Sequence, residues 1–448
     1  MLRTAAEEIR RALAHPRAPL IALVLILLYA TAARMFYLGE PCSSPCNGDA
    51  AHGLIFDEAY YVNAARVIDG INPPAGAPYA GAPLHKDPNA EHPQLAKLII
   101  AGGIELFGDN PYGWRLGSVL FGLIALIAMY ALVRGAGGSH WFAVGATGVM
   151  SLDNLMLIHS RIGTLDIYYV AMALVAAALY VRNRPLFAGL ALGIGACMKL
   201  SALGALPAFV LLEAFVVAWA RGAKPGEPGV WRTARARLKP LAVMIGASVV
   251  TLILGVWLMD ALVPAYDPGT QITYAGNPFS HISHILSYAA QLKSVPNATG
   301  ISSTPWQWLL DKNPIDYYRV AVNSVSGGKI VASRSVFYAQ GEINPFIIFL
   351  AIPALFAALG AAWYERDRIA ALGVAWCVGT FLPLVIEADG FDRISYLYYM
   401  LIVMPGVYIV VARLMSPGRV PRIATLGWAV ALVYSFVNLY PVKSLSGH

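Results

Sequence analysis

The hydrophobic positions of this chain are gathered in long uninterrupted runs, unlike the alternating or amphipathic patterns of soluble domains. A helix that crosses a membrane needs about 20 consecutive, mostly apolar residues. About eleven segments fit this template: residues 19–36, 113–133, 141–158, 164–181, 185–198, 200–220, 241–258, 345–363, 369–386, 396–412 and 423–439. The pattern therefore predicts an all-α membrane protein.

Composition supports this class. Of the 448 residues, 58% are hydrophobic and 13% are charged, whereas about a quarter of the residues of a soluble protein are charged. Disordered, collagen-like, nucleic-acid-binding and disulfide-scaffold proteins are thereby excluded. Of the four cysteines, Cys197 and Cys377 lie in apolar segments. Cys42 and Cys46 lie in a polar loop, where the sequence is compatible with a local bridge or with free thiols.

The distribution of charge predicts the topology. The net charge is +7, and a cytoplasmic N-terminus puts most lysines and arginines on the cytoplasmic side. Two long loops, residues 37–111 and 259–344, then face outward and are expected to carry short amphipathic helices. We predict a catalytic N-terminal module over residues 1–258, the second loop, and C-terminal membrane helices over 345–448. The expected location is the plasma membrane, with an extracytoplasmic site.

An acidic pair, Asp57 and Glu58, stands between aromatic residues in the first outer loop. One interpretation is structural, with Asp57 capping a helix over residues 58–68 and Glu58 in its first turn. The other is catalytic. A carboxylate such as Asp57 can take the proton of a hydroxyl that attacks a sugar carbon, with Glu58 orienting it. The sequence leaves open which of the two is the base.

Basic side chains recur at the outer ends of the predicted helices, namely Arg115, Arg161, Lys199 and Arg393. We expect them to converge on an anionic headgroup, since a guanidinium group can bind phosphate through two hydrogen bonds. The alternative is that they anchor helix ends at the membrane boundary. Asp166 begins the helix that follows Arg161, at the same outer depth.

Several segments, in this order, resemble the protein O-mannosyltransferase family. They are FDEAYY, EHPQLAKLIIAGGIELFGDNPYGWRLGSVLFG, HSRIGTLDIYY, SSTPWQWLLDKNPIDYY, INPFIIFLAIP and RISYLYYMLIVMP. The first three lie at outer helix junctions and the others lie in the second half of the chain. The Pro-Trp-x-Trp block favours this family over other members of the GT-C class of polytopic glycosyltransferases.

The resemblance implies a GT-C fold and an inverting transfer of a hexose, mannose in the family, from a polyprenyl-phosphate donor to Ser or Thr hydroxyls of secreted or membrane proteins. It gives Asp57 the role of base and matches His92 with Pro93 to the family's His-Pro motif. The chain departs from the family at Gln94, where a second proline is usual, and at Tyr398-Tyr399, where His-Tyr is typical. It has no MIR insertion, as is usual for bacterial members.

The predicted site has Asp57 and Glu58 as catalytic residues and binds substrate through His92, Lys97, Arg115, Arg161, Asp166, Lys199, Trp306 and Arg393. Trp306 has an alternative role as an interfacial anchor. His281 and His284 are spaced like metal ligands but have no acidic residue nearby in sequence, so no metal site is predicted.

The expected partners are the lipid-linked sugar donor, a Ser/Thr-containing acceptor protein and the bilayer, with no nucleic acid. The mechanism requires no cofactor, although a divalent cation could assist. The alternative function is a GT-C transferase that moves a lipid-linked sugar to lipid A or to a cell-wall glycan. Such an enzyme would use the same carboxylate and cations.

Overall fold

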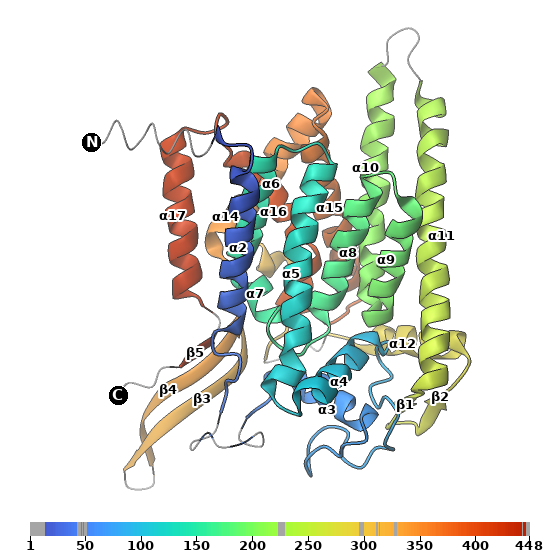
Figure 1. Cartoon of the computed structure of the whole chain (residues 1–448), viewed down its shortest axis with the longest axis vertical. Coiled ribbons are helices and arrows are strands. Elements are labelled where there is room, and N and C mark those ends of the chain that lie inside the picture. The colour runs from blue at the N-terminus through green and yellow to red at the C-terminus, as the bar shows by residue number, and fades with distance from the viewer. Residues whose placement is uncertain are drawn as a thin grey trace.

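A bundle of long helices forms most of the molecule, and the two long loops fold against one end of it, at the bottom of Figure 1. The computed structural model describes residues 14–42, 46, 48, 52–222, 229–294, 300–310, 312, 314–326, 329–440 and 442–444.

The bundle consists of α2 (Ala18–Met35), α5 (Pro111–Gly135), α6 (His140–Ser151), α7 (Asn154–His159), α8 (Asp166–Tyr180), α9 (Pro185–Met198), α10 (Leu206–Trp219), α11 (Val230–Leu262), α14 (Pro345–Gly360), α15 (Arg368–Val385), α16 (Met404–Leu414) and α17 (Arg422–Asn438). Shorter 3-10 or π-helical turns flank these helices at Leu200–Ala205, Ala220–Gly222, Ala361–Glu365, Ile386–Gly390 and Leu397–Ile402.

Every predicted segment is helical, but the boundaries differ in places. In the described part of the chain, six helical segments are long and apolar enough to cross a membrane. The number of spans therefore remains a prediction, as does the division into three regions.

The segment predicted over 141–158 is two helices, because Asp153 accepts a hydrogen bond from the backbone of Leu155 and so caps α7. The basic residues before position 241 continue α11, which hydropathy alone had shortened.

The first long loop contains α3 (Glu58–Ile68) and α4 (Leu95–Phe107). Helix α4 turns back into α5, where Asn110 caps the new helix by accepting from the backbone N–H groups of Tyr112 and Gly113. A Cβ atom on Gly103 would lie 2.2 Å from the carbonyl oxygen of Gly113. Glycine is therefore needed for the close approach that holds α4 over the end of the bundle.

The second long loop contains α12 (Pro278–Gln291), α13 (Pro305–Trp308) and four strands. Strands β1 (Ala265–Asp267) and β2 (Ile272–Tyr274) pair antiparallel. Strands β3 (Ile315–Ser326) and β4 (Lys329–Gly341) form a long antiparallel hairpin, and β5 (Val442–Ser444) pairs with β4. The chain is thus mostly helical, as predicted, but the prediction of an all-α fold omitted the hairpin that projects below the bundle in Figure 1.

Candidate active site

Asp57 lies at the start of α3, at the junction of the first loop and the bundle. It occupies the N-cap position, yet its side chain makes no capping hydrogen bond. Among the described residues its carboxylate forms no ion pair either. Burial raises the pKa of Asp57 to about 7, while Lys199 lowers it and Asp166 raises it. The side chain is therefore free to exchange a proton near neutral pH, and capping does not explain its presence.

Glu58 has a different environment from its neighbour. It is fully buried and forms a two-pronged ion pair with Arg115, with Nε and Nη2 each 2.7 Å from a carboxylate oxygen. The backbone N–H groups of Ile55 and Gly163 each donate to it at 2.7 Å. Each carboxylate oxygen thus accepts two hydrogen bonds, which leaves Asp57 as the candidate base.

Three of the predicted substrate-binding cations are occupied by protein groups. Arg115 also donates to the carbonyl oxygens of Leu38, Glu40 and Gly53, so all five of its N–H donors are used. Buried Lys97 forms a 2.5 Å ion pair with Asp87 and bonds to Asn89 and to the His92 carbonyl oxygen. Arg161 donates to the Tyr440 hydroxyl and to the Phe36 carbonyl oxygen. These bonds give Arg115, Lys97 and Arg161 a part in holding the described structure together, and their contact with substrate stays a prediction.

Lys199 and Asp166 meet at the end of the bundle, at the junctions that lead into α10 and α8. Their ion pair is 2.7 Å long, and both side chains are largely buried. The ammonium group also lies over the rings of Tyr169 and Tyr398, at 5.8 and 5.5 Å from their centroids. The charges of Lys199 and Asp166 both act on Asp57. This ion pair, which the sequence did not predict, therefore lies within electrostatic reach of the candidate base.

His92 and Arg393 complete the cationic side of the site. Burial, followed by the charges of Lys199, Lys97 and Arg393, lowers the pKa of His92 well below its usual value. His92 is thus neutral, and the positive charges of Lys199 and Arg393 both act on its ring. Arg393 pairs with Glu387, while its Nε atom is buried without a hydrogen-bond partner in the described structure. This free donor suits an oxygen of a bound phosphate.

Trp306 lies at the edge of this region on α13. Its side chain is 53% exposed, and its indole N–H donates to Asp389 at 2.9 Å. Its ring also packs edge-on against Phe381 of α15. Trp308, by contrast, is fully buried and donates to the Ser303 hydroxyl. The exposed face of Trp306 is compatible with both roles expected for it, contact with substrate and interfacial anchoring.

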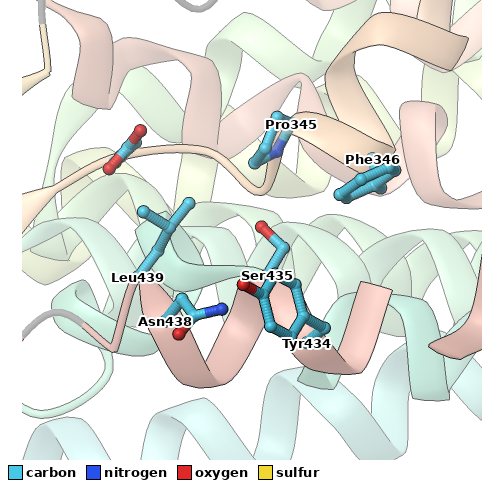
Figure 2. Close-up of a pocket in the computed structure, with 7 residues that line it drawn as sticks. Pro345, Phe346, Tyr434, Ser435, Asn438 and Leu439 are labelled. Atoms are coloured by element: carbon cyan, nitrogen blue, oxygen red, sulfur yellow. The ribbon is translucent and has the colours of Figure 1, made fainter. Parts of the chain in front are cut away.

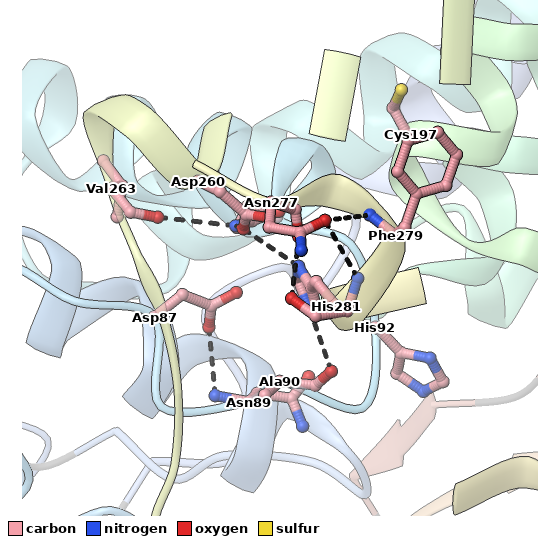
Figure 3. A network of polar contacts seen from close by, with 12 residues as sticks. Asp87, Asn89, Ala90, His92, Cys197, Asp260, Val263, Asn277, Phe279 and His281 are labelled. Carbon is pink, nitrogen blue, oxygen red and sulfur yellow. Dashed lines mark hydrogen bonds and ion pairs between the residues drawn. The ribbon is translucent and has the colours of Figure 1, made fainter. Parts of the chain in front are cut away.

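A polar network that the sequence did not predict supports the His92 loop (Figure 3). Asp260, at the end of α11, accepts a 2.6 Å hydrogen bond from Gln94 and lies 2.9 Å from Nδ1 of His281. The second ring nitrogen of His281 lies 3.1 Å from the Ala90 carbonyl oxygen. His281 therefore has an acidic partner after all, one that is distant in sequence. Gln94, which replaces a proline of the family motif, joins the first loop to the second.

A separate pocket of about 450 Å³ opens between α14 and α17 (Figure 2). Its lining includes Ser435 and Asn438 of α17 and Phe346 of α14. None of the predicted site residues lines it. We therefore locate the candidate site by the polar groups around Asp57.

Comparison with known proteins gives concordant results. The model of the family described as dolichyl-phosphate-mannose-protein mannosyltransferase matches residues 91–231. A polyprenol-phosphate-mannose–protein mannosyltransferase of Corynebacterium glutamicum is 27% identical over 421 residues, which cover 80% of this chain and 76% of that protein.

The fold is also shared with solved structures. The Saccharomyces cerevisiae protein O-mannosyltransferase Pmt1-Pmt2 complex bound to the sugar donor matches with a TM-score of 0.65 and 12% identity, over 94% of this chain and 90% of that chain. ArnT from Cupriavidus metallidurans bound to undecaprenyl phosphate matches with a TM-score of 0.51 and 15% identity, over 95% and 71% of the two chains.

The chain is similar in sequence to protein O-mannosyltransferases and shares their fold. The resemblance inferred from the motifs and the expected GT-C fold are both confirmed. Of the predicted site residues, six fall inside the segment matched by the family model: His92, Lys97, Arg115, Arg161, Asp166 and Lys199. Asp57, Glu58, Trp306 and Arg393 lie outside it, and their assignment depends on the geometry described above.

Two aromatic residues next to Asp57 were not assigned a role from the sequence. Tyr317 of β3 stacks on Phe56, and Tyr398 lies edge-on to the same ring. Both belong to segments that carried the family resemblance. Their presence in these motifs was a signal that could have marked them as candidates. Their contact with Phe56, however, depends on the tertiary fold.

Proposed function

We propose that this protein is a polyprenyl-phosphate-mannose–protein mannosyltransferase that inverts the anomeric carbon as it glycosylates Ser or Thr hydroxyls. The names of the curated relatives support mannose as the sugar, a polyprenyl phosphate as its carrier and a protein as the acceptor. The observation that carries the proposal is the arrangement of Asp57. Its carboxylate has no ion-pair partner in the described part of the chain, and the charge of Lys199, at the same end of the bundle, acts on it.

The reaction requires one proton acceptor and one stabiliser of negative charge. The hydroxyl oxygen of the acceptor attacks C1 of the sugar from the face opposite the phosphate, and Asp57 takes the hydroxyl proton. The bond from C1 to the phosphate oxygen breaks, and the polyprenyl phosphate leaves with both electrons of that bond. Lys199 and the free Nε of Arg393 would stabilise the charge that develops on the phosphate.

Glu58 and Arg115 have a positioning role in this scheme. Their ion pair binds three carbonyl oxygens and two backbone N–H groups of the segments around Asp57. The backbone of the first loop before Asp57 is thereby fixed to the residue that follows it, which favours a single geometry for attack.

The proposed topology places this site outside the cytoplasm. The chain is a multi-pass membrane protein, and both long loops fold at the end of the bundle that carries Asp57 (Figure 1). A cytoplasmic N-terminus follows from the excess of lysine and arginine in the short turns at the opposite end. We propose the plasma membrane as its location. A disulfide joins Cys42 to Cys46 in the first loop, as expected in an oxidising compartment.

The direct test is transfer by the purified protein in lipid vesicles. The protein is incubated with polyprenyl-phosphate mannose and a Ser/Thr peptide, and the peptide is examined by mass spectrometry for the gain of one hexose. Asp57→Asn protein and a peptide with every Ser and Thr replaced by Ala are the controls. Absence of transfer by correctly folded wild-type protein would refute the proposal. Labelling of lipid A or of cell-wall glycan by the same donor would favour the alternative transferase.

A further inference from the structure

The residue before Asp57 has an unusual backbone. Phe56 has a φ of 55°, in the left-handed region that aromatic residues rarely adopt. The turn around it is closed by hydrogen bonds from the Glu58 and Ala59 backbone N–H groups to the carbonyl oxygens of Ile55 and Phe56. Such backbone conformations persist only where the surrounding structure enforces them. Because the Phe56 backbone sets the direction in which the chain enters Asp57, its enforcement bears on the base.

The side chain of Phe56 is held by an aromatic residue from the other half of the chain. The rings of Phe56 and Tyr317 stack with their centroids 4.3 Å apart and an angle of 18° between their planes. Tyr398 contacts the Phe56 ring edge-on at 5.7 Å. Tyr317 belongs to β3, the first strand of the hairpin. The hairpin that the sequence did not predict thus reaches the residue next to the candidate base.

Tyr317 is itself fixed on two further sides. Its hydroxyl lies 2.7 Å from Nε2 of His159, and both side chains are buried. On the hairpin side, a Cβ atom on Gly341 of β4 would lie 2.5 Å from the Tyr317 ring. Glycine at position 341 therefore leaves the space that the ring occupies. His159 in turn lies 3.3 Å from the Thr164 hydroxyl and 3.7 Å from Asp166.

We propose that Tyr317 is a positioning residue for Asp57, acting through the ring and the left-handed backbone of Phe56, and that His159 and Gly341 keep the Tyr317 ring in place. This inference rests on the proposed function, because it takes Asp57 as the base. Without the stacked ring the turn relaxes toward ordinary φ values and the carboxylate moves away from the acceptor hydroxyl. A displacement of about 1 Å at a reacting group can reduce the rate about a hundredfold.

The test compares three variants that change the ring in different ways. Tyr317→Leu removes the stack, Tyr317→Phe removes only the bond to His159, and Gly341→Ala pushes on the ring from the opposite strand. We expect Tyr317→Leu to lower kcat about a hundredfold with little change in the KM for the lipid donor. Tyr317→Phe should lower kcat less than about tenfold, since it retains the stacking. Gly341→Ala should lower kcat while leaving every proposed substrate contact intact.

The double variant decides whether Gly341 acts through Tyr317. If it does, Tyr317→Leu combined with Gly341→Ala is no slower than Tyr317→Leu alone, whereas independent effects multiply. Tyr364→Leu and Gly427→Ala are matched controls, because Tyr364 is 85% exposed and a Cβ on Gly427 meets no atom within 4 Å. Multiplying effects, an equal loss in Tyr317→Phe and Tyr317→Leu, or a normal kcat in Tyr317→Leu would overturn the inference.

A second readout needs no transfer activity and so separates this inference from the proposed function. Asp57→Asn is expected to stabilise the wild-type protein above pH 7, because the buried carboxylate is costly to ionise. In the Tyr317→Leu background the carboxylate turns toward water, and the gain in melting temperature should shrink. An unchanged gain refutes the positioning role. If the wild-type protein shows no transfer but the gain in melting temperature from Asp57→Asn still shrinks in the Tyr317→Leu background, the proposed function is refuted and the positioning role is not.

Discussion

Replacing Asp57 by asparagine should stabilise the protein and abolish its activity. Burial raises the pKa of this carboxyl from 3.8 to about 7. Each pKa unit corresponds to about 1.4 kcal/mol, so ionised Asp57 lowers the free energy of unfolding by about 2–4 kcal/mol, the lower figure allowing for partial exposure to solvent. Asparagine cannot ionise and avoids this cost. Transfer should nevertheless fall about a hundredfold to ten-thousandfold, as for the loss of a general base.

The pH dependence has a defined sign. An acid whose pKa is higher in the folded state binds more protons when folded, so its contribution to stability falls as the pH rises from 3.8 to about 7. The advantage of Asp57→Asn is therefore greatest above pH 7 and declines to roughly half or less at pH 5. Thermal unfolding of both purified proteins at pH 8 and pH 5 measures it. Equal melting temperatures at pH 8 would show that Asp57 is solvated, and the argument for a tuned base would fail.

Asp267 provides a control of opposite sign. Burial alone would raise its pKa, but hydrogen bonds from Thr270 and the Gly269 backbone prevail and hold the pKa below its usual value. Ionised Asp267 is thus stabilised by the fold, and Asp267→Asn should lower the melting temperature at pH 8. Two Asp→Asn substitutions, one in each long loop, with opposite effects on the melting temperature would exclude a general effect of removing negative charge.

Three further outcomes are expected. Transfer should fall about tenfold for each pH unit below about 7, since Asp57 must be ionised to accept a proton; a profile that is flat to pH 5 contradicts this. Lys199→Gln should slow transfer about a hundredfold and Lys199→Arg much less, measured as kcat with the lipid donor in excess; equal rates would remove Lys199 from the phosphate site. Glu58→Gln and Arg115→Gln should each cost about 3–5 kcal/mol of stability, and melting curves of the double variant should show little further loss, unlike an additive pair.

The sequence predicted the helices because membrane helices depend on local composition. Every predicted segment is helical, and α3 begins and ends at the predicted residues 58 and 68. The β-hairpin was missed because β3 and β4 lie in a long polar loop and depend on each other for their hydrogen bonds. Hydropathy over 20 residues also cannot show where a basic helix such as α11 continues beyond the apolar part.

The site shows the same division between local and distant information. Asp57 and Lys199 were chosen as candidates from the sequence because polar residues are rare at helix ends in membrane proteins. The use of each cation was not predictable, since it depends on partners far away in the chain. Arg115 meets Glu58 across 57 positions, and Arg161 meets Tyr440 across 279. Position at a helix end therefore selected the candidates, whereas only the fold shows which of them have donors bound to protein groups.

The Glu58–Arg115 ion pair should also determine the pH range of the base. Two adjacent buried carboxylates would repel each other, and the second to ionise would have a strongly raised pKa. Arg115 removes that repulsion by neutralising Glu58 with two 2.7 Å hydrogen bonds. Arg115→Gln should therefore move the acid limb of the pH–rate profile above 7, whereas Arg115→Lys keeps the charge and should leave the limb near 7 even where the rate falls. The same limb in both variants would show that Glu58 does not act on Asp57 and that Arg115 has a structural role only.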